Sequence, residues 1–89
     1  MKFEWDKANL DHIANHQISA TEVEQIFSDL SRLKAKAYSV GQEERFATLG
    51  QTKTGRILTV IYTIRNGKIR VITAYRATKK EQRRYQEGP

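Results

Sequence analysis

Residues 56–77, RILTVIYTIRNGKIRVITAYRA, decide the fold of this 89-residue chain. Two runs rich in β-branched residues, 56–65 and 68–77, flank the pair Asn66-Gly67. Asn-Gly is the favoured pair for a two-residue type I′ turn, because both positions need a positive φ. The stretch therefore predicts a β-hairpin. Its first strand is apolar almost throughout, so we expect it in the centre of a sheet, covered on both faces.

Further strand patterns precede this hairpin. Residues 43–51 alternate moderately between apolar and polar side chains and lead to a turn at Thr54-Gly55. Residues 34–40 carry a fainter strand pattern, and residues 3–5 (FEW) could add a short strand. Because strands joined by short turns pair antiparallel, we expect the sheet to be an antiparallel meander.

Two helices are predicted before the strands. Asp6 is a suitable N-cap for a first helix that reaches about His16. A second helix begins with a capping box, formed by residues 19–22 (SATE) or by residues 21–24 (TEVE). The apolar positions expected to face the core are Leu10, Ile13 and Ala14 in the first helix and Val23, Ile26, Phe27 and Leu30 in the second.

A third helix is predicted at the end of the chain. Thr78 and Glu81 form a capping box for residues 79–87, KKEQRRYQE. This helix has almost no apolar face, so we expect it to fray, to dock through Tyr85 or to meet a charged partner. Helices, then strands, then a helix predict an α+β fold with an antiparallel sheet, in one domain over residues 1–89.

The charge distribution favours a polyanionic partner. The net charge is +6, with three basic and six acidic residues up to Leu33, against 13 basic and four acidic residues from Lys34 onward. The later part of the chain therefore has a positive field that attracts nucleic acid. The alternative interpretation is a charge that serves solubility alone.

Composition excludes several classes of protein. The chain has no cysteine, so disulfides and thiolate metal sites are excluded, and we expect a cytoplasmic protein. The first ten residues, MKFEWDKANL, lack the apolar segment of a signal peptide. The apolar run near residues 57–64 is too short to span a bilayer, so no membrane association is expected.

The arginines of the strands are the main catalytic candidates. Alternation predicts that Arg70 and Arg76 share one face of the last strand with Ile72 and Ala74. Arg45 lies on another strand, and its register stays open. A guanidinium binds phosphate through two hydrogen bonds and stabilises the charge that develops when a 2′-hydroxyl attacks phosphorus. Alternatively, these arginines are solvated or paired with nearby carboxylates.

Histidine and tyrosine are the other candidates. His12 and His16 are spaced i, i+4, but the HExxH pattern and a third ligand are missing, so a zinc site is not favoured. His16 is a candidate general acid or base, because imidazole exchanges a proton near neutral pH; it could instead cap the helix. Tyr75 and Tyr85 can stack on RNA bases, or they can tether the last helix to the sheet.

Five segments together resemble the BrnT toxins in order and spacing. They are FEWD (3–6), HIANHQIS (12–19), EERFATLG (43–50), GRILTVIY (55–62) and IRVITAYRATKKEQRRY (69–85). The resemblance implies a fold related to the RelE toxins and a ribonuclease that works without a metal or the ribosome. It also implies a ribbon-helix-helix antitoxin, BrnA, in a complex that represses its own operon, so DNA would be contacted only through the antitoxin.

The resemblance also assigns functional positions. The Glu-Arg-Phe segment of the family falls on Glu44, Arg45 and Phe46. Its strand arginine falls on Arg70, the arginine of its Ser-Ala-Arg segment on Arg76, and its closing Glu and Tyr on Glu81 and Tyr85. Three segments differ: residues 15–17 are Asn-His-Gln in place of Lys-His-Gly, residues 73–76 (TAYR) replace Ser-Ala-Arg, and the first motif is shorter than in many members.

The sequence therefore predicts a metal-independent endoribonuclease toxin that needs no cofactor. The residues predicted to act in catalysis are Arg76, Arg45, Arg70, His16 and Glu44. The residues predicted to bind the RNA are Arg56, Tyr75, Lys79, Arg83 and Tyr85. A non-catalytic RNA-binding module or a protein-interaction domain with a basic face is the alternative.

Overall fold

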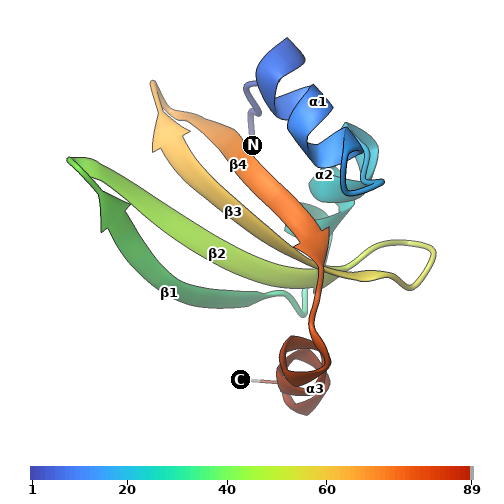
Figure 1. The fold of residues 1–89 in the computed structure, drawn as a ribbon. Helices are drawn as coiled ribbons and strands as arrows, with labels where there is room; N and C mark the ends of the chain where they lie inside the picture. The colour runs from blue at the N-terminus through green and yellow to red at the C-terminus, as the bar shows by residue number, and fades with distance from the viewer. Residues whose placement is uncertain (89) are drawn as a thin grey trace.

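The computed structural model describes residues 1–88, apart from the side chains of Lys36 and Ala37. Its elements are α1 (Lys7–Ala14), α2 (Ala20–Ser28), β1 (Leu33–Val40), β2 (Glu43–Gln51), β3 (Ile57–Arg65), β4 (Lys68–Arg76) and α3 (Lys79–Glu87). Figure 1 shows α1 and α2 on one side of the sheet and α3 crossing its lower end. The predicted α+β order of two helices, a meander and a final helix is confirmed.

The four strands form one antiparallel sheet in the order β1-β2-β3-β4. The hairpin turn between β3 and β4 has φ of 53° at Asn66 and 74° at Gly67, as the Asn-Gly pair predicts. The short strand expected at residues 3–5 is reduced to one parallel bridge between Phe3 and Ile69. This bridge places the N-terminal segment along the free edge of β4.

The helix starts are as predicted, and one helix end is not. Asp6, Ser19 and Thr78 each accept a hydrogen bond from the backbone N–H three residues on, so the second helix uses the box at 19–22. Helix α1 ends at Ala14, two residues before the expected end, because Gln17 adopts a positive φ of 61°. The positive φ of Gln17 lets the N–H of Ile18 donate a hydrogen bond to the carbonyl of Ile13. It also turns the Ile18 side chain into the core, where that side chain is 3% exposed.

The main core lies between the two N-terminal helices and one face of the sheet. Its residues are Ile13, Ile18, Val23, Ile26, Phe27, Leu58, Val60, Tyr62, Ile69, Val71 and Ala74. Gly50 of β2 lies directly under Ile26, where a side chain would collide with the helix. The predicted core positions Leu10, Ala14 and Leu30 are wrong. Leu10 and Ala14 are exposed because α1 lies along the edge strand β4 and turns Asn9 and Ile13 inward. Leu30 is fully exposed because α2 ends at Ser28.

A β-bulge in β4 changes which side chains share a face. Ile61 pairs with Thr73 and Tyr62 pairs with Val71, so Ile72 has no partner on β3. The alternation of side chains reverses at an extra residue. Val71 therefore faces the core before the bulge and Ala74 faces it after the bulge. The prediction that Arg70, Ile72, Ala74 and Arg76 share one face is wrong for this reason.

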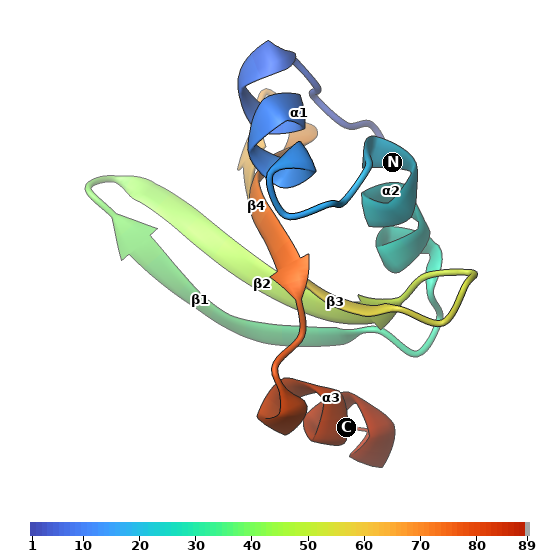
Figure 2. The same ribbon diagram turned by 45° about the vertical axis from the view of Figure 1, so that its right-hand side comes forward.

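Helix α3 covers the lower end of the opposite face of the sheet, as Figure 2 shows. Tyr85 of α3 packs against a small cluster formed by Leu33, Leu49 and Ala77. Strand β3 is thus covered on both faces there, as predicted: Leu58 is buried under α2, and Thr59, on the other face, is 2% exposed. Among the helices of the described chain, none is long and apolar enough to cross a membrane.

Candidate functional site

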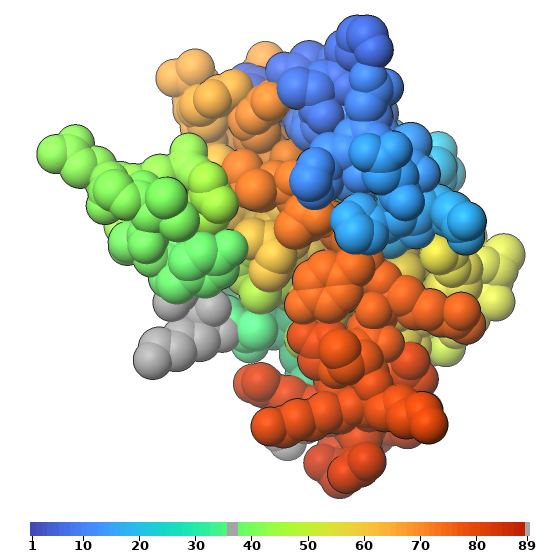
Figure 3. Space-filling model, in the orientation of Figure 1, coloured from blue at the N-terminus to red at the C-terminus, as the bar shows by residue number. Residues whose placement is uncertain are grey.

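We call the sheet face opposite α2 the open face; it is lined by Arg45 of β2, Thr59, Ile61 and Thr63 of β3, and Arg70, Thr73 and Tyr75 of β4. These residues alternate with the core residues of the same strands, and the registers place them on one side. In Figure 3 the β1–β2 hairpin bounds this face on one side, α1 on the other and α3 below.

Arg45 lies on the hairpin side of the open face. Its Nε donates a 2.9 Å hydrogen bond to Glu43 Oε1, and its side chain is 25% exposed. Glu43, and then the hydroxyl of Tyr38 across the β1–β2 pair, raise the pKa of Arg45. The guanidinium therefore stays charged and is held in place. Glu44, the carboxylate predicted to act beside it, points to the other face by alternation and is exposed, so the acidic neighbour of Arg45 is Glu43.

Tyr75 lies on the open face near the end of the edge strand β4. It is paired in register with Thr59, and its hydroxyl donates a 3.1 Å hydrogen bond to Glu81 Oε2 of α3. Burial and the charge of Glu81 raise the pKa of Tyr75, so the phenol keeps its proton. Within the described residues, the buried hydroxyl oxygen of Thr59 has no hydrogen-bond partner. Tyr75 thus joins the floor of the open face to the helix that borders it.

Two imidazoles lie beside β4 at the edge of the open face. His12 Nε2 is 3.0 Å from Thr73 Oγ1, and the ring centroids of His12 and His16 are 5.7 Å apart. His16 follows the end of α1 and is exposed, so it is available to a ligand. In the described part of the chain, no group of three or more His, Asp or Glu side chains is arranged to hold a metal ion.

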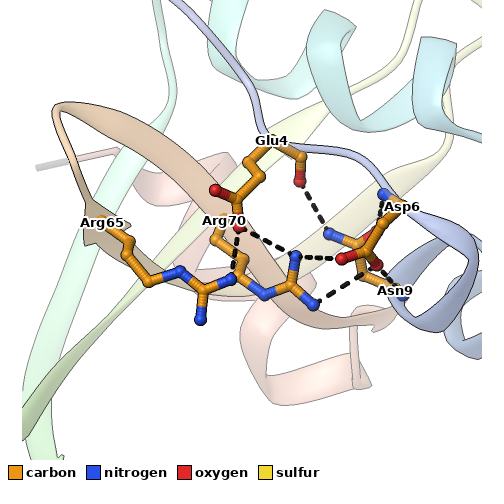
Figure 4. Close-up of polar contacts among 5 residues, drawn as sticks. All are labelled: Glu4, Asp6, Asn9, Arg65 and Arg70. Carbon is orange, nitrogen blue, oxygen red and sulfur yellow. Dashed lines mark hydrogen bonds and ion pairs between the residues drawn. The ribbon is translucent and has the colours of Figure 1, made fainter.

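Arg70 is bound by carboxylates of the N-terminal segment (Figure 4). Its Nη1 donates to Asp6 Oδ2 at 2.8 Å and to Glu4 Oε1 at 3.0 Å, and the side chain is 15% exposed. Glu4 also accepts a hydrogen bond from Arg65. Asp6 raises the pKa of Arg70. Arg70 therefore holds the N-terminal segment and the start of α1 against β4.

Arg76 and Arg56 lie at the α2 side of the sheet. Arg76 follows Ala74 on the core side, at the exposed end of β4. Among the described residues, no hydrogen bond or ion pair to the Arg76 side chain is found. Arg56 Nη1 donates to Glu22 Oε2 at 2.7 Å and to the Gln17 carbonyl at 3.2 Å, so this arginine joins β3 to the N-terminal helices.

The three RNA-binding candidates of α3 divide into two groups. Lys79 and Arg83 are exposed on the outer side of the helix, where a polyanion can reach them. Tyr85 is partly buried between α3 and the sheet, and its hydroxyl donates to Asp29. The alternative interpretation of Tyr85, a tether for the last helix, is therefore the one that the packing supports.

The structure brings together only part of the predicted site. Arg45, Arg70 and Tyr75 lie on the open face, and the two histidines border it. Arg70 is engaged there by Glu4 and Asp6, and Arg76 lies on the other face. The three arginines do not converge on one phosphate. Sequence reasoning missed Tyr38 and Thr59, because only the β1–β2 and β3–β4 registers place them beside Arg45 and Tyr75. The alternative interpretation of Arg45, pairing with a nearby carboxylate, is the one that the structure supports, through Glu43.

The structure is a small basic α+β domain. Arginine, tyrosine and histidine side chains surround its open sheet face, and this arrangement is typical of the class of proteins that bind single-stranded nucleic acid. The family model of the ribonuclease toxin BrnT of type II toxin–antitoxin systems matches residues 5–81, and the chain belongs to this family. It is thus a member of a family of ribonuclease toxins that act in toxin–antitoxin pairs. No curated protein matches the chain significantly.

Proposed function

We propose that this protein is a metal-independent endoribonuclease that cleaves RNA on its open face. The observation that supports the site is the fixed guanidinium of Arg45, which lies on the same sheet face as Tyr75 and beside the hydroxyl of Tyr38. Membership of the ribonuclease family supports the reaction class. The open face also offers what single-stranded RNA requires, namely a cation for phosphate and an aromatic ring for a base.

The proposed reaction is attack of a ribose 2′-oxygen on the adjacent phosphorus. The 2′-hydroxyl loses its proton, the P–O5′ bond breaks, and the leaving 5′-oxygen gains a proton. The products are a 2′,3′-cyclic phosphate and a 5′-hydroxyl end. Arg45 stabilises the extra negative charge on the phosphorane, and His16 serves as one of the two proton-transfer groups. Tyr75 stacks against a base, and Arg76, Lys79 and Arg83 contact phosphates on either side.

Two of the predicted residues become positioning residues in this proposal. Arg70 and Arg56 act as positioning residues, because their ion pairs join the N-terminal segment and α2 to the sheet. Arg70 fixes Asp6, the N-cap of the helix that carries His12. Losing either arginine is therefore expected to affect cleavage through the stability of the fold.

The test is digestion of a mixed-sequence RNA by purified protein in EDTA, followed by analysis of the fragment ends. We expect cleavage with 2′,3′-cyclic phosphate and 5′-hydroxyl ends, and a loss of about 10²–10³-fold in rate for Arg45→Ala. Lys68→Ala, which removes an exposed cation at the β3–β4 hairpin, is the matched control. Salt-sensitive RNA binding without any cleavage would instead support the non-catalytic RNA-binding module.

We further propose a cytoplasmic protein that is neutralised by a ribbon-helix-helix antitoxin of the BrnA type. A partner that covers the open face blocks RNA, and DNA is then contacted only by the antitoxin. Co-expression with the small protein encoded beside the gene tests this: the complex should form, and RNA cleavage should stop at a 1:1 ratio. A complex that still cleaves RNA would show that the antitoxin does not cover the open face.

A further inference from the structure

Besides the open face, a basic pocket lies between the end of α3 and the start of β1, away from Arg45. It has a volume of about 670 Å³, and its walls include Arg32, Lys34 and Arg84. None of its lining residues in the described chain is a carboxylate. The nearby carboxylate of Asp29 is engaged by the hydroxyl of Tyr85 and by the backbone N–H groups of the residues at positions 31 and 51. The cations Lys34 and Arg84 therefore line a pocket whose described wall holds no acid.

The guanidinium of a third lining residue, Arg32, is held away from this pocket. Arg32 Nη1 donates a 3.2 Å hydrogen bond to Thr48 Oγ1, and its guanidinium carbon lies 5.2 Å from the centre of the Phe27 ring. Thr48 and Phe27 lie on the α2 side of the sheet, whereas Leu33 and Tyr85 of the pocket lie on the other side. Lys34 and Arg84 are exposed at the pocket, and Arg84 projects from the last turn of α3.

The pocket also has an apolar wall. Leu30 is fully exposed there, and Leu33 and Tyr85 line the pocket beside it. A pocket that combines cations with an apolar wall suits a ligand that carries both an anionic and an apolar group. A nucleotide has the matching chemistry, because it joins an anionic phosphate to a flat base that packs on apolar and aromatic surfaces. An acidic peptide would satisfy the cations alone.

The position of the pocket fits an extended RNA strand. Glu81, which holds Tyr75, and Arg84 are three residues apart on α3, or about 4.5 Å along the helix axis. The pocket therefore lies about one helical turn beyond the open face. We infer that the α3–β1 pocket binds a nucleotide of single-stranded RNA outside the cleaved linkage; this inference rests on the proposed function, because it assumes an RNA substrate.

The test measures RNA binding separately from cleavage. The probe is a fluorescein-labelled, mixed-sequence 12-nucleotide RNA with 2′-O-methyl groups throughout, which cannot react through its 2′-oxygens. Its Kd is measured by fluorescence anisotropy at several salt concentrations for the wild type and for the double variant Lys34→Gln/Arg84→Gln. Neither side chain packs in the core, and thermal unfolding checks the fold. The matched control is Lys2→Gln/Lys68→Gln, which removes two exposed cations at the opposite end of the sheet.

We expect the pocket variant to raise Kd about tenfold. The slope of log affinity against log salt concentration should become shallower by about 1.4, since each phosphate contact in a single strand contributes about 0.7 to that slope. The control should change Kd less than twofold. A pocket variant that binds the probe like the control would overturn the inference even if the protein cleaves RNA. A variant that loses antitoxin affinity but keeps RNA affinity would also overturn it, because the occupant would then be an acidic protein. A third outcome is that the wild type never cleaves RNA, while the pocket variant still loses affinity for the probe. That outcome would support the pocket and contradict only the proposed reaction.

Discussion

The Tyr85 hydroxyl of α3 donates a 2.5 Å hydrogen bond to Asp29 Oδ2, 56 residues earlier in the chain. Asp29 Oδ2 also accepts a hydrogen bond from the backbone N–H of Gln51. One carboxylate therefore joins the end of α2, strand β2 and the final helix. Burial alone would raise the pKa of Asp29, but the hydrogen bonds from Tyr85 and from backbone amides outweigh it and lower that pKa.

Tyr85→Phe should lower the free energy of unfolding by about 1–2 kcal/mol, because a hydrogen bond to a charged group is lost while the ring keeps its packing. Urea denaturation at pH 7 measures the change. Lys80→Gln is the control, since Lys80 is an exposed residue of the same helix. Equal stability of Tyr85→Phe and the wild type would show that α3 is held by the apolar contacts alone.

Stability above pH 10 should depend on the same tyrosine. Burial and Asp29 raise the pKa of Tyr85 to about 12, against about 10 for a tyrosine in an unfolded chain. The folded protein thus keeps a proton that the unfolded chain loses, so the stabilisation is complete below pH 10 and declines as the pH rises toward 12. Melting temperatures at pH 9, 10 and 11 should fall more steeply for the wild type than for Tyr85→Phe. Parallel curves would contradict the assignment.

Acid stability should depend on the ion pairs of Arg70. Arg65 holds the pKa of Glu4 below its usual range, and Arg70 does the same for Asp6. These carboxylates stabilise the fold above their unfolded pKa values near 4, and the stabilisation is lost as the pH falls through the lower folded values. In Arg70→Gln, the loss of stability between pH 5 and pH 2 should be smaller.

A local readout separates this role from a general loss of stability. The amides of Glu4 and Ile69 bond to the carbonyls of Ile69 and Lys2, respectively, across the edge of β4. Hydrogen exchange at both amides should be faster in Arg70→Gln than in Lys68→Gln at pH 7. Unchanged exchange at these two positions would mean that Arg70 does not hold the N-terminal segment.

Gly50 should be intolerant of any side chain. A Cβ at this position would lie 2.8 Å from Ile26 Cγ2 and 3.1 Å from the Ile26 carbonyl oxygen. Gly50→Ala should therefore destabilise the protein by about 1–3 kcal/mol through overpacking. Gly41→Ala is the comparison variant. An added Cβ there meets no atom within 4 Å, but the residue has a positive φ of 62°, so the free energy of unfolding should fall by about 1–2 kcal/mol through backbone strain alone. The contact of α2 with β2 is refuted if Gly50→Ala unfolds at the same urea concentration as the wild type.

Arg76 and Arg45 should differ in their kinetic effects. Arg76 is exposed at the end of β4, on the other face from Arg45. Arg76→Ala should therefore raise KM and lower the salt slope for RNA by about 0.7. Arg45→Ala should lower kcat. A large fall in kcat for Arg76→Ala, with KM unchanged, would place Arg76 at the scissile linkage and contradict this division.

Local sequence signals predicted most of the fold. The Asn66-Gly67 turn needs only the conformational preferences of two adjacent residues, and the caps at Asp6 and Thr78 need only residues three positions apart. Leu10 was mispredicted because a helical pattern does not show which face the helix turns toward the sheet, and Leu30 was mispredicted because α2 ends at Ser28. The end of α1 was misplaced because the reversed φ of Gln17 depends on drawing Ile18 into the core.

The sequence by itself determined the elements, their order, the positive charge of the later strands and the family, because each depends on short-range preference or on composition. Only the tertiary structure decided which functional groups meet. One unpaired residue, Ile72, reverses the faces of β4, and carboxylates far away in the chain occupy Arg70 and Tyr85. Side-chain partners depend on register and on long-range ion pairs, and neither leaves a periodic signal in a single chain.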